Sequence, residues 1–234
     1  MRCERSRFDR LPTIDGIQVG RPRLRLKNPV LSTGGEVIDN SLYAFFSVAV
    51  DTDFDVNQVL FQNSIGQSYT PVGGTAFALT LLHTNMEGTG GQLPNGYKLD
   101  VQAIRLVVDQ AIQYKDLDNL LFNTFGQFNI GQKYYWEGSL SEIPGNTGAT
   151  LSQSPSTTNG PANVSGMPGN LKGVYSLSAG LEASIAYGQN FNFLINPTLG
   201  ESGPWTTQTD GATPPGVGFR AWVHLDGIWY RPTQ

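Results

Sequence analysis

Two histidines are the side chains best suited to proton transfer in this sequence, and each lies in a run of residues typical of a β-strand. His224 is followed two residues later by Asp226, so an extended backbone places both side chains on one face of the strand. Such a pair defines a reaction only when a nucleophile stands beside it, and the spacing around His83 and His224 supplies none. We therefore expect both histidines to be polar residues on strand surfaces.

Three alternating carboxylates, Asp51, Asp53 and Asp55, could attract Ca²⁺, which takes six to eight oxygen ligands in proteins. If they began an EF-hand loop, its sixth position would be Val56 rather than glycine and its twelfth Gln62 rather than glutamate. The EF-hand interpretation therefore fails. We predict a solvated acidic turn and no metal site.

The motifs of several enzyme classes are absent from the chain. It contains no G-x-S-x-G nucleophile elbow, no phosphate-binding P-loop, no G-x-G-x-x-G after a strand and no H-E-x-x-H zinc motif. A β-sandwich hydrolase stays as a minor alternative, but no acid pair stands out among the scattered carboxylates. We expect no enzymatic activity and no cofactor.

Positive charge is concentrated at the N-terminus. Residues 1–27 hold eight basic and three acidic side chains, a formal charge of +5, whereas the remainder carries −9. Clustered cations at one end of an otherwise acidic chain are typical of polyanion binding, because phosphate contacts release counterions. We predict contact with nucleic acid, an anionic membrane leaflet or an acidic patch on a neighbouring subunit; the alternative is an arm whose charges are simply solvated. The predicted binding residues are Arg2, Arg5, Arg7, Arg10, Arg21, Arg23, Arg25 and Lys27.

The element pattern predicts a β-rich domain behind this arm. Residues 1–40 have little periodicity and contain three prolines before position 30, which favours an extended arm. Residues 41–234 contain repeated aromatic and β-branched runs bounded by turn residues. The predicted strand-bearing segments are 41–50, 56–65, 75–84, 97–109, 128–143, 174–180, 184–197 and 217–232.

Two local irregularities are visible in this pattern. In 97–109 the apolar residues change phase near Ala103, which predicts a bulge or a strand that changes faces. In 116–125 leucines recur at helical spacing, which predicts one short helix with Asp116 as its cap.

Two long stretches lack strand signals. Residues 144–173 are rich in glycine, serine, threonine, asparagine and proline, and residues 197–216 are similar but include Trp205. We interpret both as long loops outside the core, available for contacts or display.

The amino-acid composition fits one domain, part of whose surface is buried against neighbouring subunits. A chain of 234 residues with 39% hydrophobic content can build one substantial core. Charged residues make up 15%, below the roughly 25% of average chains, and interface cores are depleted in charge. The single cysteine, Cys3, rules out an internal disulfide. The charged start and the lack of a long apolar run predict a protein made without secretory export.

The C-terminal two-thirds resembles one family. The residues that carry the resemblance are LHTNMEGTGGQLPNGYKLDVQAIRL (82–106), GQNFNFLI (188–195) and WVHLDGIWYRPTQ (222–234). They resemble the jelly-roll capsid proteins of small tailless icosahedral bacteriophages. The resemblance implies an eight-stranded sandwich that forms trimers or pseudo-hexameric capsomers, with the arm at the inner surface and loops at the outer surface or between subunits. The chain is short for two rolls in tandem, so we expect one.

The combined expectation is an all-β, single jelly-roll β-sandwich of about eight strands, with an extended N-terminal arm, long loops and one short helix. Its expected function is that of a capsid subunit, made in the host cytoplasm and assembled in the virion with copies of itself and other virion proteins. The alternative is a phage fibre, spike or other glycan- or receptor-binding module in which Trp205 and the long loops bind a saccharide.

Overall fold

The computed structural model describes residues 13–14, 17–18, 35–109, 112–143, 175–177, 183–198, 204–207 and 217–232. The chain divides into two compact units, Met1–Gly35 and Glu36–Gln234. In the first unit, strand β1 (Thr13–Ile14) pairs antiparallel with β2 (Ile17–Gln18).

The second unit is predominantly β-structure, as the sequence predicts. Its elements in chain order are β3 (Gly35–Ala49), β4 (Asp53–Phe54), β5 (Gln58–Leu60), β6 (Ser68–Tyr69), β7 (Phe77–Ala78), β8 (Lys98–Val108), α1 (Tyr114–Phe122), β9 (Phe125–Ile130), β10 (Lys133–Ser139), the 3₁₀ helix η1 (Leu140–Glu142), β11 (Tyr175–Ser176), β12 (Ala183–Ala186), β13 (Phe191–Asn196), β14 (Trp205–Thr206) and β15 (Val217–Pro232). Within the described residues, no helix is long and apolar enough to cross a membrane.

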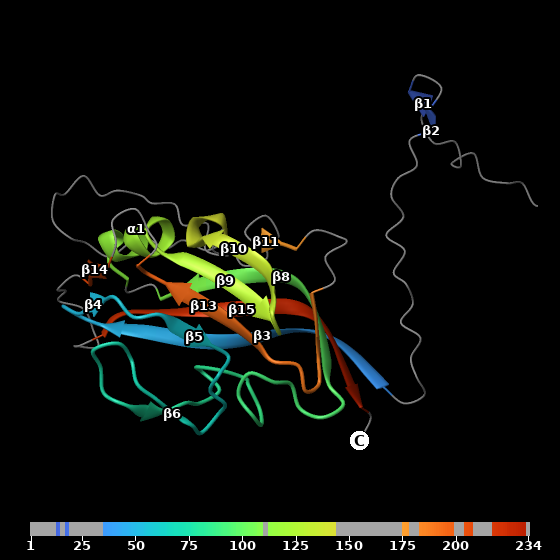
Figure 1. The fold of residues 1–234 in the computed structure, drawn as a ribbon, viewed down its shortest axis with the longest axis horizontal. Coiled ribbons are helices and arrows are strands. Elements are labelled where there is room, and N and C mark those ends of the chain that lie inside the picture. The colour runs from blue at the N-terminus through green and yellow to red at the C-terminus, as the bar shows by residue number, and fades with distance from the viewer. Residues whose placement is uncertain are drawn as a thin grey trace, which may run out of the picture. The chain divides into compact units, whose positions relative to one another are not determined.

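Two antiparallel sheets, one drawn in front of the other in Figure 1, share one hydrophobic core. One sheet has the strand order β10-β9-β13-β5, and the other has the order β11-β8-β15-β3, with β12 also pairing with β8. Buried side chains from both sheets form a single cluster, which includes Phe193 of β13, Phe128 of β9, Phe46 of β3 and Leu225 of β15. The prediction of an all-β sandwich is therefore confirmed.

Alternation along the strands explains why the sheets face each other. In β13, Phe191, Phe193 and Ile195 are buried, whereas the intervening Asn192 and Leu194 are partly exposed. Side chains of a strand point alternately to its two faces, so this sequence offers an apolar face to the core and a mainly polar face to the outside. The same alternation runs along β9 and β15.

The change of phase predicted near Ala103 is a β-bulge. Asp226 of β15 pairs with Ala103 of β8, but the next residue, Gly227, pairs with Val101. Gln102 is therefore the extra residue of β8, and the bulge lets Val101 before it and Ile104 after it both lie in the core.

The helix prediction is correct in type and displaced in position. Helix α1 begins at Tyr114 and follows Gln113, so Asp116 is buried in the first turn and is not the cap. Phe125, which matched the helical spacing, is the first residue of β9. The backbone leaves the helix at Asn123, and the apolar residues then follow the period of a strand.

Three predicted strands have different bounds. The strand predicted at 41–50 begins earlier, at Gly35, and the one predicted over 56–65 contains only Gln58–Leu60. The segment 75–84 forms only the two-residue strand Phe77–Ala78. Its second half is a turn, because the amides of His83 and Thr84 both donate to the carbonyl oxygen of Thr80, at 2.9 and 3.1 Å.

Candidate functional site

The predicted polyanion-binding residues, from Arg2 to Lys27, all lie outside the described residues. The predicted loop 144–173 also lies outside them.

A polar network on the outer face of the larger sheet contains the histidine–carboxylate pair. The guanidinium of Arg105 on β8 donates to both carboxylate oxygens of Asp226, each at 2.9 Å. Its Nη2 also lies 3.2 Å from Nδ1 of His224, and the hydroxyl of Ser41 on β3 lies 2.9 Å from the same nitrogen. The ring of Tyr43 stacks on the imidazole with centroids 5.3 Å apart. The network therefore connects three neighbouring strands.

Burial and charge keep His224 neutral. Burial of the imidazole, together with the positive charge of Arg105, lowers the pKa of His224 to about 4, although Asp226 acts in the opposite direction. For Asp226, burial alone raises the pKa, but hydrogen bonds from Arg105 and Ser41 and the positive charge of Arg105 outweigh it, so the net pKa is lowered. At neutral pH the network thus holds a neutral imidazole and an ionised carboxylate.

This arrangement is suited to joining strands and poorly suited to proton transfer. Arginine has donors only, so its contact with His224 uses the lone pair of Nδ1 and places the ring proton on Nε2. Nδ1, the nitrogen that faces Ser41, therefore already accepts a hydrogen bond from Arg105 and is not free to take a proton from the hydroxyl. In addition, a pKa of about 4 makes the imidazole a weak base at neutral pH. The network supplies no activated nucleophile.

Sequence reasoning placed His224 and Asp226 on one face, which is confirmed, but it missed Arg105 and Ser41. Their strands are far from β15 in sequence, and the order of strands in a sheet cannot be deduced from spacing. One signal was present: Arg105 is a charged residue in the middle of a mostly apolar strand.

His83 lies in a turn and not on a strand, which corrects the prediction. Its ring packs against Phe45 and Phe77, with centroids 4.8 and 4.9 Å apart, and its Nδ1 accepts from the amide of Thr80 at 3.1 Å. Burial and the charge of Arg220 lower its pKa. The imidazole is part of an aromatic cluster that packs against β3 and β15 through Phe45 and Trp222.

The three alternating aspartates are not gathered into one cluster. Asp53 lies in β4 and accepts a hydrogen bond from the hydroxyl of Thr206 on the paired strand β14, at 2.5 Å. Asp51 has a φ of 52° in the turn that follows β3. Across the described residues, no three His, Cys, Asp or Glu side chains gather closely enough to hold a metal ion.

Trp205 is part of the core, which corrects the prediction that 197–216 lies wholly outside it. The residue belongs to β14 and is 7% exposed. Its ring packs edge-on against Phe54 and stacks on Phe219, with centroids 5.5 and 5.7 Å apart. A ring enclosed in this way cannot stack on a saccharide, so the predicted sugar-binding role of Trp205 is wrong.

The outer face of the smaller sheet carries mostly amides and apolar groups, and Asn129 Nδ2 donates to Asn192 Oδ1 at 2.9 Å. It also carries a charge, because Glu137 pairs with Gln127 and its carboxylate accepts from Gln127 Nε2 at 3.3 Å. Beside these pairs, Leu194 pairs with Val59 and Gln127. We call this surface the amide face; its residues are Val59, Gln127, Asn129, Tyr134, Asn192 and Leu194.

A second uncharged surface is formed by two consecutive leucines. Leu81 and Leu82, in the turn that includes His83, are 64% and 80% exposed. The turn is fixed to the larger sheet, because the indole N–H of Trp222 donates to the carbonyl oxygen of Leu82 at 2.9 Å. The two leucine side chains are therefore exposed to solvent on a turn whose position is fixed.

Comparison of the chain with protein-family models, with curated proteins and with solved structures finds no match in any of the three.

Proposed function

We propose that this protein is a non-enzymatic structural subunit of a virion shell, built on a single jelly roll. The observation that carries the proposal is the order of the strands. Eight strand positions pair in a nested way, the first with the last: β3 with β15, β5 with β13, β8 with β11 and β12, and β9 with β10. Strands β11 and β12 count as one position, because they pair with consecutive parts of β8.

Nested pairing supports a jelly roll for a geometric reason. In a jelly roll, one long antiparallel hairpin pairs the first strand with the last, the second with the seventh and so on, and the hairpin then folds over into two sheets. The resulting sheets contain positions 6-3-8-1 and 5-4-7-2 along the chain, which are the two orders of strands described above. Eight-stranded jelly rolls occur in viral capsid proteins and also in lectins and cupins. The strand order therefore supports all three classes equally, and the chemistry of the surface is what favours one of them.

The surface favours assembly. The amide face on the smaller sheet, and the exposed Leu81 and Leu82 on a turn fixed to the larger sheet, offer mostly uncharged area, with the carboxylate of Glu137 beside the amide face. Charged residues are depleted in the cores of protein interfaces. In this chain they make up only 15% of all residues. A subunit with neighbours on several sides requires more than one such surface. We therefore propose copies of the chain, in trimers or pseudo-hexameric capsomers, and other virion proteins as its partners, in a virion assembled from protein made in the host cytoplasm.

Substitution of Leu82 by aspartate tests this surface. A charge placed at the centre of an apolar contact must be desolvated without a partner, so we expect Leu82→Asp to weaken subunit association at least tenfold. Sedimentation velocity over a range of concentrations measures it. Asn57→Asp is the matched control, because it adds the same charge on a segment that already contains Asp55. Equal association by both variants would contradict a role for the leucine pair.

The basic arm is proposed to face the interior and to bind polyanion there. Salt dependence tests this proposal, because each phosphate contact contributes roughly 0.9 to the slope of log K against log salt concentration on duplex DNA. We expect a slope several units steeper for the full chain than for a chain that begins at Val30. Identical, flat slopes would remove nucleic acid as the partner of the arm.

A further inference from the structure

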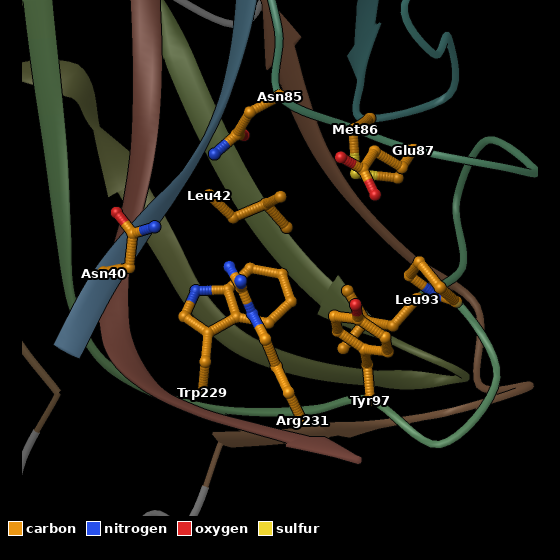
Figure 2. A pocket seen from close by; sticks show the side chains of 10 residues that line it. Asn40, Leu42, Asn85, Met86, Glu87, Leu93, Tyr97, Trp229 and Arg231 are labelled. Carbon is orange, nitrogen blue, oxygen red and sulfur yellow. The ribbon is translucent and has the colours of Figure 1, made fainter. Parts of the chain in front are cut away.

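A pocket of about 380 Å³ opens between the start of β3, the loop that precedes β8 and the end of β15 (Figure 2). Its walls include Asn40, Glu87, Tyr97, Trp229 and Arg231. The volume lies within the range of small-molecule sites in proteins. All of its walls belong to one unit of one chain, so the pocket does not depend on assembly.

Two hydrogen-bond donors of this pocket have no acceptor within the described part of the chain. Trp229 is 6% exposed, and its indole Nε1–H has no hydrogen-bond partner. The Nε–H of Arg231 is also buried and without an acceptor. A buried donor without a partner costs about 1–3 kcal/mol, and more when the group is charged. Both donors belong to residues that line the pocket, so a bound oxygen atom that displaces the groups covering them could accept from them.

The guanidinium of Arg231 is held in place by the aromatic wall. Its central carbon lies 5.8 Å from the ring centroid of Tyr97 and 5.9 Å from that of Trp229. The two rings are nearly perpendicular, with centroids 6.2 Å apart. Figure 2 shows the guanidinium next to the indole ring. None of the ion pairs between described residues includes Arg231, so the pocket contains a fixed cation without a carboxylate partner.

Glu87 offers an acceptor to a ligand that carries donors of its own. Glu87 lines the pocket, is exposed and takes part in no ion pair among the described residues. Asn85 is a fixed wall, because its side chain accepts from the amide of Tyr43 and donates to the carbonyl oxygen of Ser41, both at 2.8 Å. Hydroxyl groups, which both donate and accept, satisfy such mixed surroundings.

We propose that this pocket binds a sugar acid. The carboxylate accepts from Arg231 and from the indole N–H of Trp229, and hydroxyls of the ring donate to Glu87. A carboxylate alone makes no contact with Glu87, which then stays hydrated, and a neutral sugar leaves Arg231 without a counter-charge. The inference goes beyond the proposed shell role, because it assigns a ligand site to each single subunit.

Isothermal titration calorimetry of the full chain with sodium glucuronate, glucose and sodium acetate tests the assignment. We expect glucuronate to bind at least tenfold more tightly than glucose or acetate, since a hydrogen bond to a charged group is worth about one factor of ten or more. No measurable binding of glucuronate, or equal binding of glucose, would overturn it. Assembly is measured separately, so either proposal can fail without the other.

Two variants link binding to the named donors. Arg231→Gln removes the charge, and we expect it to lower the affinity for glucuronate at least tenfold. Trp229→Phe removes the indole N–H and keeps a smaller aromatic ring. We expect this variant to fold with a lowered melting temperature and to bind glucuronate several-fold more weakly than the wild type. Lys133→Gln removes an exposed charge on β10 and should bind within twofold of wild type. Full affinity in a folded Trp229→Phe or Arg231→Gln variant would contradict the assigned contacts.

Discussion

Replacement of Phe193 by alanine is expected to lower the free energy of unfolding by about 3–5 kcal/mol, the usual cost of deleting a large buried ring. Phe193 is completely buried between the two sheets, and its ring stacks on that of Trp136 with centroids 5.6 Å apart. Its neighbours belong to fixed strands, so the space cannot collapse fully around the missing ring. Urea denaturation followed by near-ultraviolet circular dichroism measures the loss.

The adjacent residue provides the control. Leu194 points away from the core on the same strand, so Leu194→Ala should cost less than about 1 kcal/mol. Similar losses in both variants would mean that β13 does not present alternate faces to the core and to the outside, and the sandwich described here would be wrong.

Acid is expected to destabilise the protein through His224. The pKa of this imidazole is about 4 in the folded chain and about 6.5 when it is unfolded. Between these values the unfolded state binds a proton that the folded state does not, so the free energy of unfolding falls as the pH drops from about 6.5 to about 4. The difference amounts to roughly 3 kcal/mol from this one residue. Below that range Asp226, whose pKa is lowered, adds a further loss when its carboxylate becomes protonated.

Chemical denaturation at a series of pH values measures this dependence. In His224→Gln the glutamine carbonyl can still accept from Arg105 but cannot titrate, so most of the loss between pH 6.5 and 4 should disappear. His83→Gln should retain most of it. If the wild type and His224→Gln lose stability equally over this range, the imidazole is not the group responsible.

The long regular elements were predictable from sequence, because their patterns extend over many residues. The predicted range 217–232 is the range of β15, and the predicted 97–109 contains β8 together with its bulge. In both segments alternation alone separates the buried from the outward residues. The short helix was also recognised from the spacing of Leu117 and Leu120, both of which are buried in the core.

Short elements were mispredicted because local composition does not determine their partners. The segment 75–84 has the composition of a strand, but hydrogen bonds from the amides of His83 and Thr84 to the carbonyl oxygen of Thr80 form a turn in its second half. Trp205 lies among glycine, proline and threonine, which indicate a loop, whereas a two-residue pairing with β4 carries it into the core. One aromatic residue in a polar stretch gives no periodicity from which its burial could be deduced.

The polar network and the pocket could not be predicted, since each combines side chains from three separate segments. Arg105, His224 and Ser41 meet only because β8, β15 and β3 are neighbours in one sheet. Similarly, Trp229 and Arg231 become pocket walls through their position beside the loop that contains Glu87 and Tyr97. The sequence shows which side chains are present, but only the order of the strands shows which of them lie together.

Negative-stain electron microscopy of the purified full-length chain at neutral pH tests the proposed shell role most directly. Our account predicts closed shells, or capsomers in which several subunits repeat around a symmetry axis. A uniform field of single-subunit particles at every protein concentration would contradict it.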